Sequence, residues 1–346
     1  MTTLDNYGGW ASVLGTLAAG RDIGPGEARA ALGSILAGEA TDAQVAAFIV
    51  ALRLKGPAVG ELLGLVGAMR DAATPLDLPE DAIDIVGTGG TAGRKNHALN
   101  VSTMACFVAA GAGARVCKHG SVKASSTSGS FDLLDAVGVP ITASSQEVAE
   151  AVHTAGLGFA FAKTFHPAMR HVAAVRSEVG ISTVFNLLGP LSHPGHVKRQ
   201  VLGVLERSLA PTMAAVLQAT GSVRSLVVHG DGQYDELSTT GPNLVVDLDE
   251  GEVREYRVEA ADVGLTSATH DQLRGGDTVT NARILAAVLA GEHGPKRDMV
   301  VLNAAAGLVV AGIADDLAEG VDAAAAAIDD GRAARKFDEV TTASTG

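Results

Sequence analysis

The first part of the chain carries apolar side chains at helical spacing. In the segment GEATDAQVAAFIVALRLKG (38–56), apolar residues recur at i, i+3, i+4 and i+7 and so share one helix face: Val45, Phe48, Ile49 and Leu52. Thr41 or Asp42 stands just before this pattern as a candidate N-cap. The segment GELLGLVGAMRDAA (60–73) repeats the spacing. These patterns predict that residues 1–75 are helical.

From Asp84 onward the pattern changes to short apolar runs that end in Gly or polar residues. Helical stretches separate these runs, an alternation typical of a mainly parallel sheet with helices on both faces. The predicted strands are AIDIVG (82–87), ARVCKHG (114–120), VPIT (139–142), GFAFA (158–162) and SLVVHG (225–230).

Two later segments return to helical spacing. Residues 167–195 are long enough to pack back on the N-terminal helices, and the tail 294–337 contains at least two Ala-rich helices. The pattern therefore predicts an α/β protein with a small helical domain and a larger α/β domain, whose mainly parallel central sheet is flanked by helices.

The composition limits the size of the fold, the make-up of its core and the ligands that the protein can bind. The 346 residues suit one large α/β unit or two domains that share a boundary. Hydrophobic residues make up 47% of the chain but aromatic residues only 3%, so the core must be aliphatic. A net charge of −13 and a pI of about 5.2 would repel a nucleic-acid backbone. An anionic ligand must therefore be held by a local group of donors.

The two cysteines indicate a reducing compartment. Cys106 and Cys117 lie in apolar surroundings without metal-binding or redox spacing, so we expect buried free thiols. No signal peptide precedes residue 25, and no apolar run approaches transmembrane length. A soluble cytoplasmic protein without a membrane partner is expected.

The segment DIVGTGGTAGRKNHALNVST (84–103) is a glycine-rich turn with three basic side chains, Arg94, Lys95 and His97. Its GTGG (87–90) lies between a predicted strand and a predicted helix, where backbone N–H groups can face an anion. Glycine-rich turns also occur there for steric reasons alone, so this tetrapeptide leaves both interpretations open. Further short donors follow at Asn100, Ser102 and Thr103.

A second polar loop, KHGSVKASSTSGSFD (118–132), follows the next strand and carries Lys118, His119 and Lys123. It is either a solvated turn or the second wall of a ligand crevice at the carboxyl edge of the sheet.

Adjacent carboxylates stand in the turn DGQYDELSTTG (231–241), at Asp235 and Glu236. Such a pair is commonly just solvated, but it can share Mg²⁺, which would in turn hold phosphate oxygens.

Basic side chains gather in FHPAMRHVAAVRSEVG (165–180), at His166, Arg170, His171 and Arg176. Arg176 either forms a surface salt bridge or offers a bidentate fork to a carboxylate substrate.

These motifs, in this order, resemble the anthranilate phosphoribosyltransferase family over nearly the whole chain. The segments that carry the resemblance are DIVGTGG, NVST, KHG with the following serines, HPAMRHVAAVR, TVFNLLGPL and DELSTTGP. The resemblance implies the nucleoside phosphorylase-type phosphoribosyltransferase fold and a homodimer joined through the helical domain. The implied boundaries are 1–78 and 166–200 for the helical domain, and 79–165 and 201–346 for the phosphoribosyl-binding domain.

The resemblance also implies a reaction. An aromatic amine displaces pyrophosphate from C1 of 5-phosphoribosyl-1-pyrophosphate (PRPP), with Mg²⁺ as cofactor. Because a polyanion departs from an oxocarbenium-like centre, catalysis should consist mainly of charge stabilisation and alignment. No clear general base emerges from the sequence.

Roles are carried over by motif. The resemblance assigns PRPP to Gly87, Thr88, Gly89, Gly90, Asn100, Ser102, Thr103 and Lys118. It assigns the metal to Ser102, Asp235 and Glu236. The acceptor route is assigned to His119, His166, Arg176 and Gly189, with His119 and Arg176 as the catalytic candidates and Arg176 facing the acceptor carboxylate. Further substrate contacts are expected at Gly120, Ser121, Lys123, Ser126 and Lys163.

The chain departs from the family pattern in its ligand-facing loops. Thr91 replaces an acid after GTGG, and the loop that follows is longer than usual. Ser121 and Val122 replace an asparagine and an arginine, and Lys163 replaces a proline. One hypothesis is that a new set of cations re-forms the anionic site for a different acceptor: Arg94, Lys95, Lys123 and Lys163.

Three functions are compatible with these residues. The first is a PRPP-dependent transferase acting on anthranilate or a near analogue. The second keeps the fold but uses another acceptor, or phosphate as in a nucleoside phosphorylase. The third is a non-catalytic nucleic-acid-binding relative, which the acidic pI and the intact Asp235–Glu236 pair oppose.

Overall fold

The computed structural model describes residues 3–89, 99–122, 128–232 and 234–342. Helices form at the N-terminus where the spacing predicts them. Helix α3 begins after Thr41, whose Oγ1 accepts a 3.3 Å hydrogen bond from the N–H of Gln44 and so caps the helix. The predicted apolar face of α3 is buried. The N-terminal helices are α1 (Gly9–Ala18), α2 (Pro25–Leu36), α3 (Asp42–Lys55) and α4 (Val59–Asp71).

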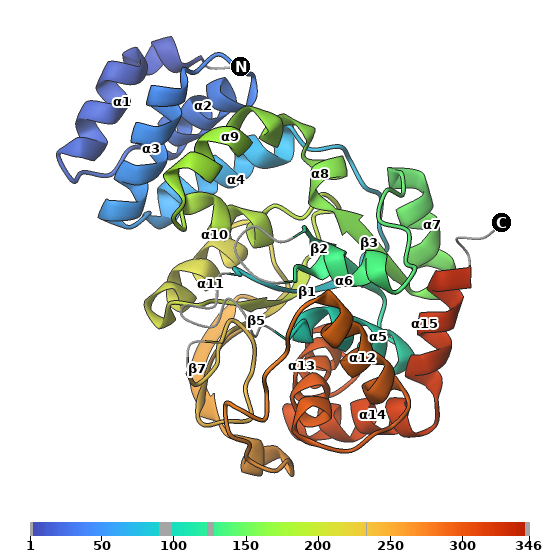
Figure 1. The fold of residues 1–346 in the computed structure, drawn as a ribbon. Coiled ribbons are helices and arrows are strands. Elements are labelled where there is room, and N and C mark those ends of the chain that lie inside the picture. Colours follow the sequence, from blue (N-terminus) through green and yellow to red (C-terminus); the bar gives the residue numbers. More distant parts are fainter. Residues whose placement is uncertain (1–2, 90–98, 123–127, 233, 343–346) are drawn as a thin grey trace.

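Two helices return to this group, as the sequence predicts. Helix α9 (Arg170–Val179) packs against α2 and α3, and α10 (Val184–Leu191) packs against α3 and α4. Figure 1 shows these helices together at one end of the molecule, with α10 next to the sheet. A shared aliphatic core holds them, and it continues onto one face of the sheet.

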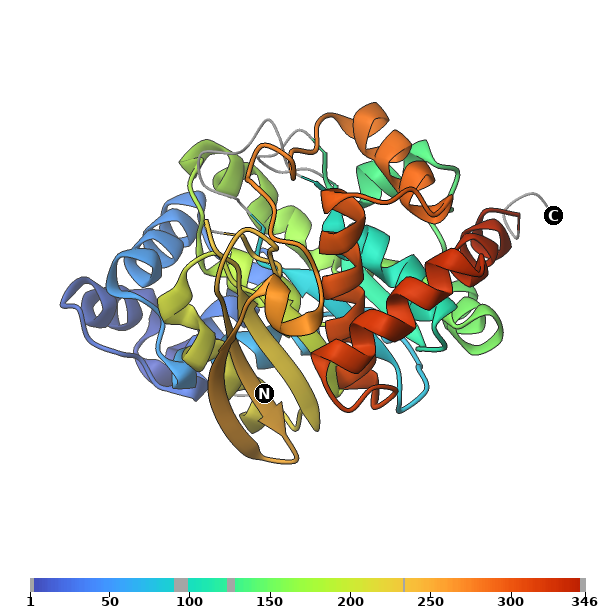
Figure 2. The ribbon, with the colours of Figure 1, turned by 90° about the horizontal axis from the view of Figure 1, so that it is seen from below.

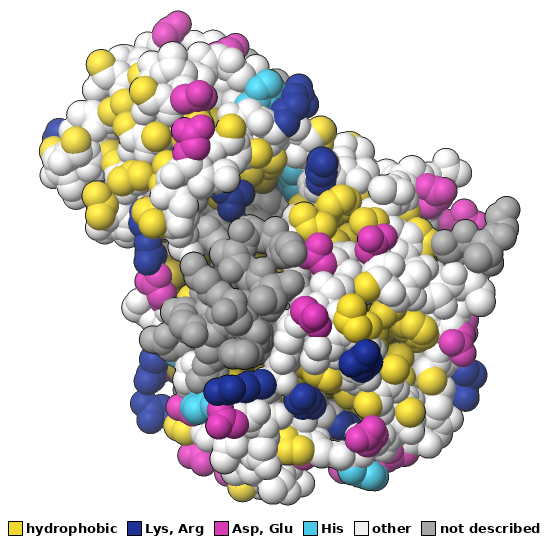
Figure 3. Space-filling model, in the orientation of Figure 1, with side chains coloured by type: hydrophobic (Ala, Val, Ile, Leu, Met, Phe, Trp, Pro, Cys, Tyr) yellow, Lys and Arg dark blue, Asp and Glu magenta, His cyan; other side chains and the backbone are white. Residues whose placement is uncertain are grey.

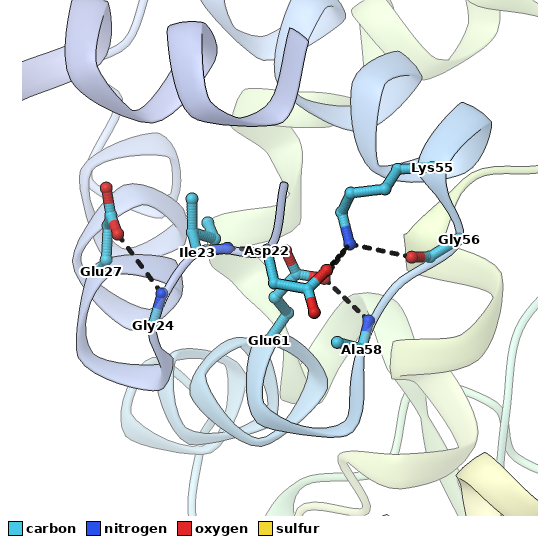
Figure 4. Close-up of polar contacts among 8 residues, drawn as sticks. All are labelled: Asp22, Ile23, Gly24, Glu27, Lys55, Gly56, Ala58 and Glu61. Atoms are coloured by element: carbon cyan, nitrogen blue, oxygen red, sulfur yellow. Dashed lines mark hydrogen bonds and ion pairs between the residues drawn. The ribbon is translucent and has the colours of Figure 1, made fainter. Parts of the chain in front are cut away.

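A buried ionic group braces the N-terminal helices (Figure 4). The Glu61 carboxylate accepts hydrogen bonds from Ile23 N–H at 3.1 Å and from Ala58 N–H at 2.8 Å. The ammonium of Lys55 lies 2.8 Å from Glu61 and 2.6 Å from Asp22. Burial opposes the charge on Lys55, but its bonds to Asp22 and Glu61 raise its pKa above the ordinary value. The α1–α2 connection is therefore tied to the α3–α4 turn.

In the part of the chain that the structure describes, seven strands form one sheet in the order β3-β2-β1-β4-β5-β6-β7. The first five strands are parallel, and β6 and β7 continue the sheet antiparallel, so the predicted mainly parallel sheet is confirmed. Figure 2 shows β6 and β7 as a hairpin at the free edge. The strands are β1 (Ile83–Gly87), β2 (Val116–Gly120), β3 (Leu157–Phe161), β4 (Arg199–Gly203), β5 (Arg224–His229), β6 (Asn243–Asp249) and β7 (Glu252–Val258).

The strand predicted at 139–142 is wrong. These residues form an irregular connection between α6 (Ser130–Ala136) and α7 (Ser145–Ala155). Val139 is buried against the core without pairing in the sheet, and Pro140 has no N–H to donate to a ladder. A short apolar run next to a proline therefore packs as a loop.

Helices cover both faces of the sheet, and strand alternation decides what meets them. On one face lies a core shared with α5 (Val101–Gly111) and the C-terminal helices. On the other face, α10 and α11 cover the middle strands, and α7 covers β2 and β3. The remaining helices are α8 (Ala162–Phe165), α11 (Ala210–Ala219), α12 (Thr278–Leu289), α13 (Pro295–Ala311), α14 (Leu317–Asp329) and α15 (Arg332–Thr342).

The tail and the cysteines also follow the sequence predictions. Helices α13, α14 and α15 occupy the predicted Ala-rich tail. Cys106 and Cys117 are buried free thiols, and burial raises the pKa of Cys106 to about 12. Among the helices of the described residues, none has the length and apolar character needed to cross a bilayer.

Candidate functional site

The site lies at the carboxyl edge of the sheet, where the strand order reverses. The chain runs from β1 outward through β2 to β3, then continues from β4 on the other side of β1. Such a reversal leaves a crevice beyond the strand ends. The loops after β1 and β2 meet there, because Asn100 Nδ2 donates to Ser128 O at 3.3 Å and Ser128 Oγ donates to Asn100 Oδ1 at 3.0 Å. The structure therefore brings the two predicted polar loops together.

Lys118 lies on the α5 side of the sheet. Its side chain is buried, and Nζ donates to Ile85 O at 2.6 Å and to Ser102 Oγ at 3.2 Å. Thr103 lies next to Ser102 on α5, and its hydroxyl is buried without a partner among the described residues. Lys118 and Ser102 thus link the end of β2 to the start of α5.

The glycine turn after β1 meets Asp235. Gly89 N–H donates to Asp235 Oδ2 at 2.6 Å. A Cβ on Gly87 would lie 2.2 Å from that same oxygen, and one on Gly203 would lie 1.7 Å from the backbone O of Asp235. The Asp235 segment therefore crosses directly over the ends of β1 and β4, which only glycine permits.

Burial makes the Asp235–Glu236 pair costly to ionise. Burial raises the pKa of Asp235, although the Gly89 N–H and Lys118 oppose this. Burial and the adjacent Asp235 both raise the pKa of Glu236. A divalent cation would offset the repulsion between these carboxylates, and hard oxygen donors are what Mg²⁺ prefers. The donor chemistry of this pair therefore suits Mg²⁺.

His119 lies on the opposite face from Lys118, because successive residues of β2 alternate between faces. Its Nδ1 lies 3.2 Å from Gly189 O, and since a carbonyl only accepts, Nδ1 carries the proton. Its ring lies 5.1 Å from that of His166, centroid to centroid. The Nε2 atoms of both rings are buried without a partner among the described residues. His119 thus lies beside both His166 and Gly189, the other two of these residues expected along the acceptor route.

These histidines are neutral at pH 7. Burial lowers the pKa of His119 well below its usual range, and the neighbouring His166 and His193 lower it further. Burial lowers the pKa of His166 to about 4. Both rings therefore present lone pairs rather than positive charge.

Arg176 is half-buried on α9. Burial lowers its pKa, and its guanidinium carbon lies 5.1 Å from the ring centroid of Phe185 on α10. Its fork forms no ion pair with any residue in the described parts of the chain, so the salt-bridge alternative is not found there. The contact with Phe185 places Arg176 beside α10, and no hydrogen bond joins it to the described histidines.

A cavity of about 490 Å³ lies between the helical part and the sheet, next to the glycine turn. Its lining includes Thr88 and Gly89 from the turn, and residues 53–57, 182–184, 186 and 187 from the helical part. A concave site between two parts of a fold is typical of small-molecule binding. Thr88 also holds the edge of this space, because its Oγ1 accepts a 3.2 Å hydrogen bond from Leu205 N–H.

The altered positions lie on the surface or outside the described residues. Ser121, Val122 and Lys163 are exposed, Lys163 on α8 and the other two directly after Gly120. The remaining predicted residues of the two loops lie outside the described residues: Gly90, Thr91, Arg94, Lys95, Lys123 and Ser126.

Two buried polar residues escaped the sequence predictions. Asp84 accepts 3.2 Å hydrogen bonds from His119 N–H and from Gln200 Nε2. The sequence did contain a signal for Asp84, because a charged residue inside the apolar run AIDIVG indicates a buried carboxylate that needs hydrogen-bond partners. Gln200 showed no sign in the sequence, because its partners come from distant segments.

The chain matches known families along most of its length. The sequence model described as "Glycosyl transferase family, a/b domain" matches residues 79–334, and "Glycosyl transferase family, helical bundle domain" matches residues 11–73. An anthranilate phosphoribosyltransferase of Chloroflexus aurantiacus is 45% identical over 335 residues, which cover 96% of this chain and 98% of that protein. The chain belongs to the anthranilate phosphoribosyltransferase family.

Other members of the family agree in sequence and structure. The anthranilate phosphoribosyltransferase of Methylocella silvestris is 47% identical over 96% of this chain and 94% of its own length. The crystal structure of the Thermus thermophilus enzyme superposes with a TM-score of 0.90 at 40% identity, covering 96% of this chain and 99% of that one. The Saccharomyces cerevisiae enzyme in complex with PRPP and Mg gives a TM-score of 0.87 at 28% identity, covering 97% and 98%.

Proposed function

We propose that this protein transfers the 5-phosphoribosyl group of PRPP to the amine of anthranilate or a closely related aromatic acid and releases pyrophosphate. One observation carries the proposal beyond family membership. At the end of β2, Lys118 donates to the Ser102 hydroxyl and, against the effect of burial, lowers the pKa of both Asp235 and Glu236, while on the other side of the sheet His119 lies against the neutral His166. A polyanionic donor and an uncharged amine would thus meet at one strand end.

The donor side suits a magnesium-bound pyrophosphate. The groups proposed to hold PRPP are Gly87, Thr88, Gly89, Asn100, Ser102, Thr103 and Lys118, with Gly90 outside the described residues. Asp235, Glu236 and Ser102 would hold Mg²⁺, which when bound neutralises part of the charge on the leaving pyrophosphate. Lys118 would face the same phosphate oxygens once a ligand draws its Nζ from Ile85 O.

The acceptor side suits an uncharged aromatic amine. The unpartnered Nε2 atoms of His119 and His166 would accept hydrogen bonds from amine N–H groups, and neither ring would repel the developing positive charge. A Cβ added to Gly189 would meet no atom of the described residues within 4 Å, so the space directly beside it is open in that part of the chain. Arg176 would supply a bidentate fork to the carboxylate.

The assembly and setting follow from family membership. We propose a homodimer joined through a helical domain of residues 1–78 and 166–200, with the phosphoribosyl-binding domain in 79–165 and 201–346. A cytoplasmic place in tryptophan biosynthesis is proposed with it. No nucleic-acid partner is proposed, because the net charge is −13 and the face in Figure 3 shows described Lys and Arg side chains scattered among acids.

A coupled assay tests the proposal. Purified protein, PRPP, Mg²⁺ and anthranilate should release pyrophosphate at the rate at which anthranilate fluorescence is lost. Arg176→Lys should raise the KM for anthranilate about 10-fold because it loses the bidentate geometry. The matched control is Arg170→Lys, since Arg170 is exposed and, among the described residues, donates to Pro167 O alone. Equal effects of both substitutions would reject the role of Arg176.

The altered loop positions favour a second acceptor as the alternative. Ser121, Val122 and Lys163 are exposed where the family carries other residues, so the acceptor specificity can differ. Pyrophosphate release with another aromatic acid, but not with anthranilate, would establish that alternative. Lys163→Ala should then raise the KM for that acid, whereas an unchanged KM would exclude Lys163 from acceptor binding.

A further inference from the structure

The end of α10 forms an unusual junction. The last carbonyls of a helix have no partner within the helix and must be satisfied from outside. Here three consecutive carbonyls each accept from a side chain of a different element. Gly189 O accepts from His119 on β2 at 3.2 Å, Pro190 O from Gln200 on β4 at 2.9 Å, and Leu191 O from Arg70 on α4 at 3.3 Å.

The next residue lies close to the second histidine, because the backbone of Ser192 opposes the lowering of the His166 pKa by burial. The His166 ring also lies 5.1 Å from that of His119, centroid to centroid. Fixing the end of α10 therefore fixes the His119 ring, against which His166 lies.

Gln200 joins this row to the sheet. Its amide nitrogen uses both hydrogens, one to Pro190 O at 2.9 Å and one to Asp84 Oδ2 at 3.2 Å. The other oxygen of Asp84 accepts from His119 N–H at 3.2 Å. Gln200 and Asp84 are paired neighbours on β4 and β1, and both are buried. One amide thus links the backbone of His119, through Asp84, with the carbonyl next to Gly189.

We propose that Gln200 is a positioning residue for the acceptor side: it holds the Gly189–Pro190 end of α10 against the His119 ring without touching either substrate. Its amide adds a second connection between β2 and the end of α10, beside the direct hydrogen bond from the His119 ring to Gly189 O. No other described side chain bonds both Asp84 and an α10 carbonyl. The identity of the acceptor rests on the proposed function, whereas the hydrogen bonds through which Gln200 holds the end of α10 do not depend on it.

Two substitutions separate this role from a packing role. Gln200→Met keeps the volume and removes both donors, and Gln200→Asn keeps an amide that is too short to reach both partners. The matched control is Gln218→Met, because Gln218 Nε2 also donates to a backbone carbonyl, Gly251 O at 2.7 Å, but at the surface.

The first readout does not depend on activity. In protein labelled with ¹⁵N-histidine, wild type should show the His119 ring as the Nδ1–H tautomer. Both Gln200 variants should shift the His119 and His166 nitrogen signals and leave those of His293 unchanged. Unshifted signals in a folded Gln200→Met protein would overturn the proposal.

The second readout is the KM for each substrate. We expect both Gln200 variants to raise the KM for anthranilate about 10-fold, while the KM for PRPP changes by less than about 2-fold, because misplacement is confined to the acceptor side. Equal changes in the two KM values, or misfolding of both variants, would overturn the proposal, since Gln200 would then stabilise the whole fold and not the acceptor side in particular. An inactive wild type would refute the proposed function alone, because the histidine signals still decide the role of Gln200.

Discussion

Asp235 accepts a 2.6 Å hydrogen bond from the N–H of Gly89, so a carboxylate from the protein itself lies at the glycine turn. A glycine turn before a helix is expected to face a phosphate. The acid at this place would repel a free polyanion. Binding of a metal by Asp235 and Glu236 converts the repulsion into attraction, which makes the donor site dependent on the cation.

Asp235→Asn tests this dependence. The variant should keep the Gly89 hydrogen bond but weaken PRPP binding in Mg²⁺ by at least about 10-fold, because a neutral amide is a poor Mg²⁺ ligand. Calorimetric titration with PRPP, with and without Mg²⁺, measures the effect. Asp231→Asn, at a partly exposed position in the same turn, serves as the control. If PRPP bound both variants equally well, Asp235 would have no part in the metal site.

Gly203→Ala should displace the Asp235 segment. The new Cβ would lie 1.7 Å from the backbone O of Asp235, so the turn must move away. We expect a loss of about 1–3 kcal/mol in unfolding free energy and a raised requirement for Mg²⁺. Urea unfolding and the Mg²⁺ dependence of turnover measure these effects. Gly33→Ala is the control, because a Cβ at that helical position meets no described atom within 4 Å. If both variants lost the same unfolding free energy, the Asp235 segment would not lie directly over Gly203.

Asp84 should make stability depend on pH. Burial raises its pKa from 3.8 to about 6, against the opposing effects of Lys118 and its hydrogen bonds. The folded state therefore holds the proton more tightly than the unfolded chain, and this stabilisation is complete below pH 3.8 and lost as the pH rises through 6. The loss amounts to about 3 kcal/mol for a shift of about two units.

Asp84→Asn removes that dependence. Between pH 4 and pH 7, the unfolding free energy of wild type relative to the variant should fall by about 2.4 kcal/mol. Denaturant unfolding at several pH values measures the difference. Asp81→Asn is the control, because Asp81 is exposed and paired with Arg115. Parallel curves for wild type and Asp84→Asn would show that Asp84 does not titrate in this range.

Breaking the buried group at Glu61 should destabilise the N-terminal helices. Glu61→Leu removes one of the two carboxylates that pair with the Lys55 ammonium and leaves two N–H groups without an acceptor, which costs at least about 2 kcal/mol. The control is Asp71→Asn, which breaks the half-exposed pair with Arg29 and should cost less than about 1 kcal/mol. Thermal unfolding of both variants gives the comparison. Similar melting temperatures would contradict a bracing role for Glu61.

Local patterns account for most of the fold. The apolar face of α3 and its Thr41 cap are contained in neighbouring residues, so spacing alone located the helix. The β2 motif KHG likewise placed Lys118 and His119 at a strand end. Alternation along a strand then requires that they face opposite sides, although the sequence did not say what lies on each side.

Where local pattern was the only guide, it also failed. Residues 139–142 look like a strand, but their apolar side chains are buried by neighbouring helices instead of by strand pairing. The antiparallel hairpin of β6 and β7 was not predicted, since β7 is largely exposed and lacks an apolar run.

The sequence by itself determined the fold class, the helical return of residues 167–195 and the residue types of the site, because each rests on spacing within a few turns or a short motif. Only the tertiary structure decided which partners those residues meet. Gly89 and Asp235 lie 146 residues apart in the chain, and Gln200 and Asp84 lie 116 apart. Hydrogen bonds of a few ångströms between such distant segments exist only after the strands are ordered side by side, so no local pattern encodes them.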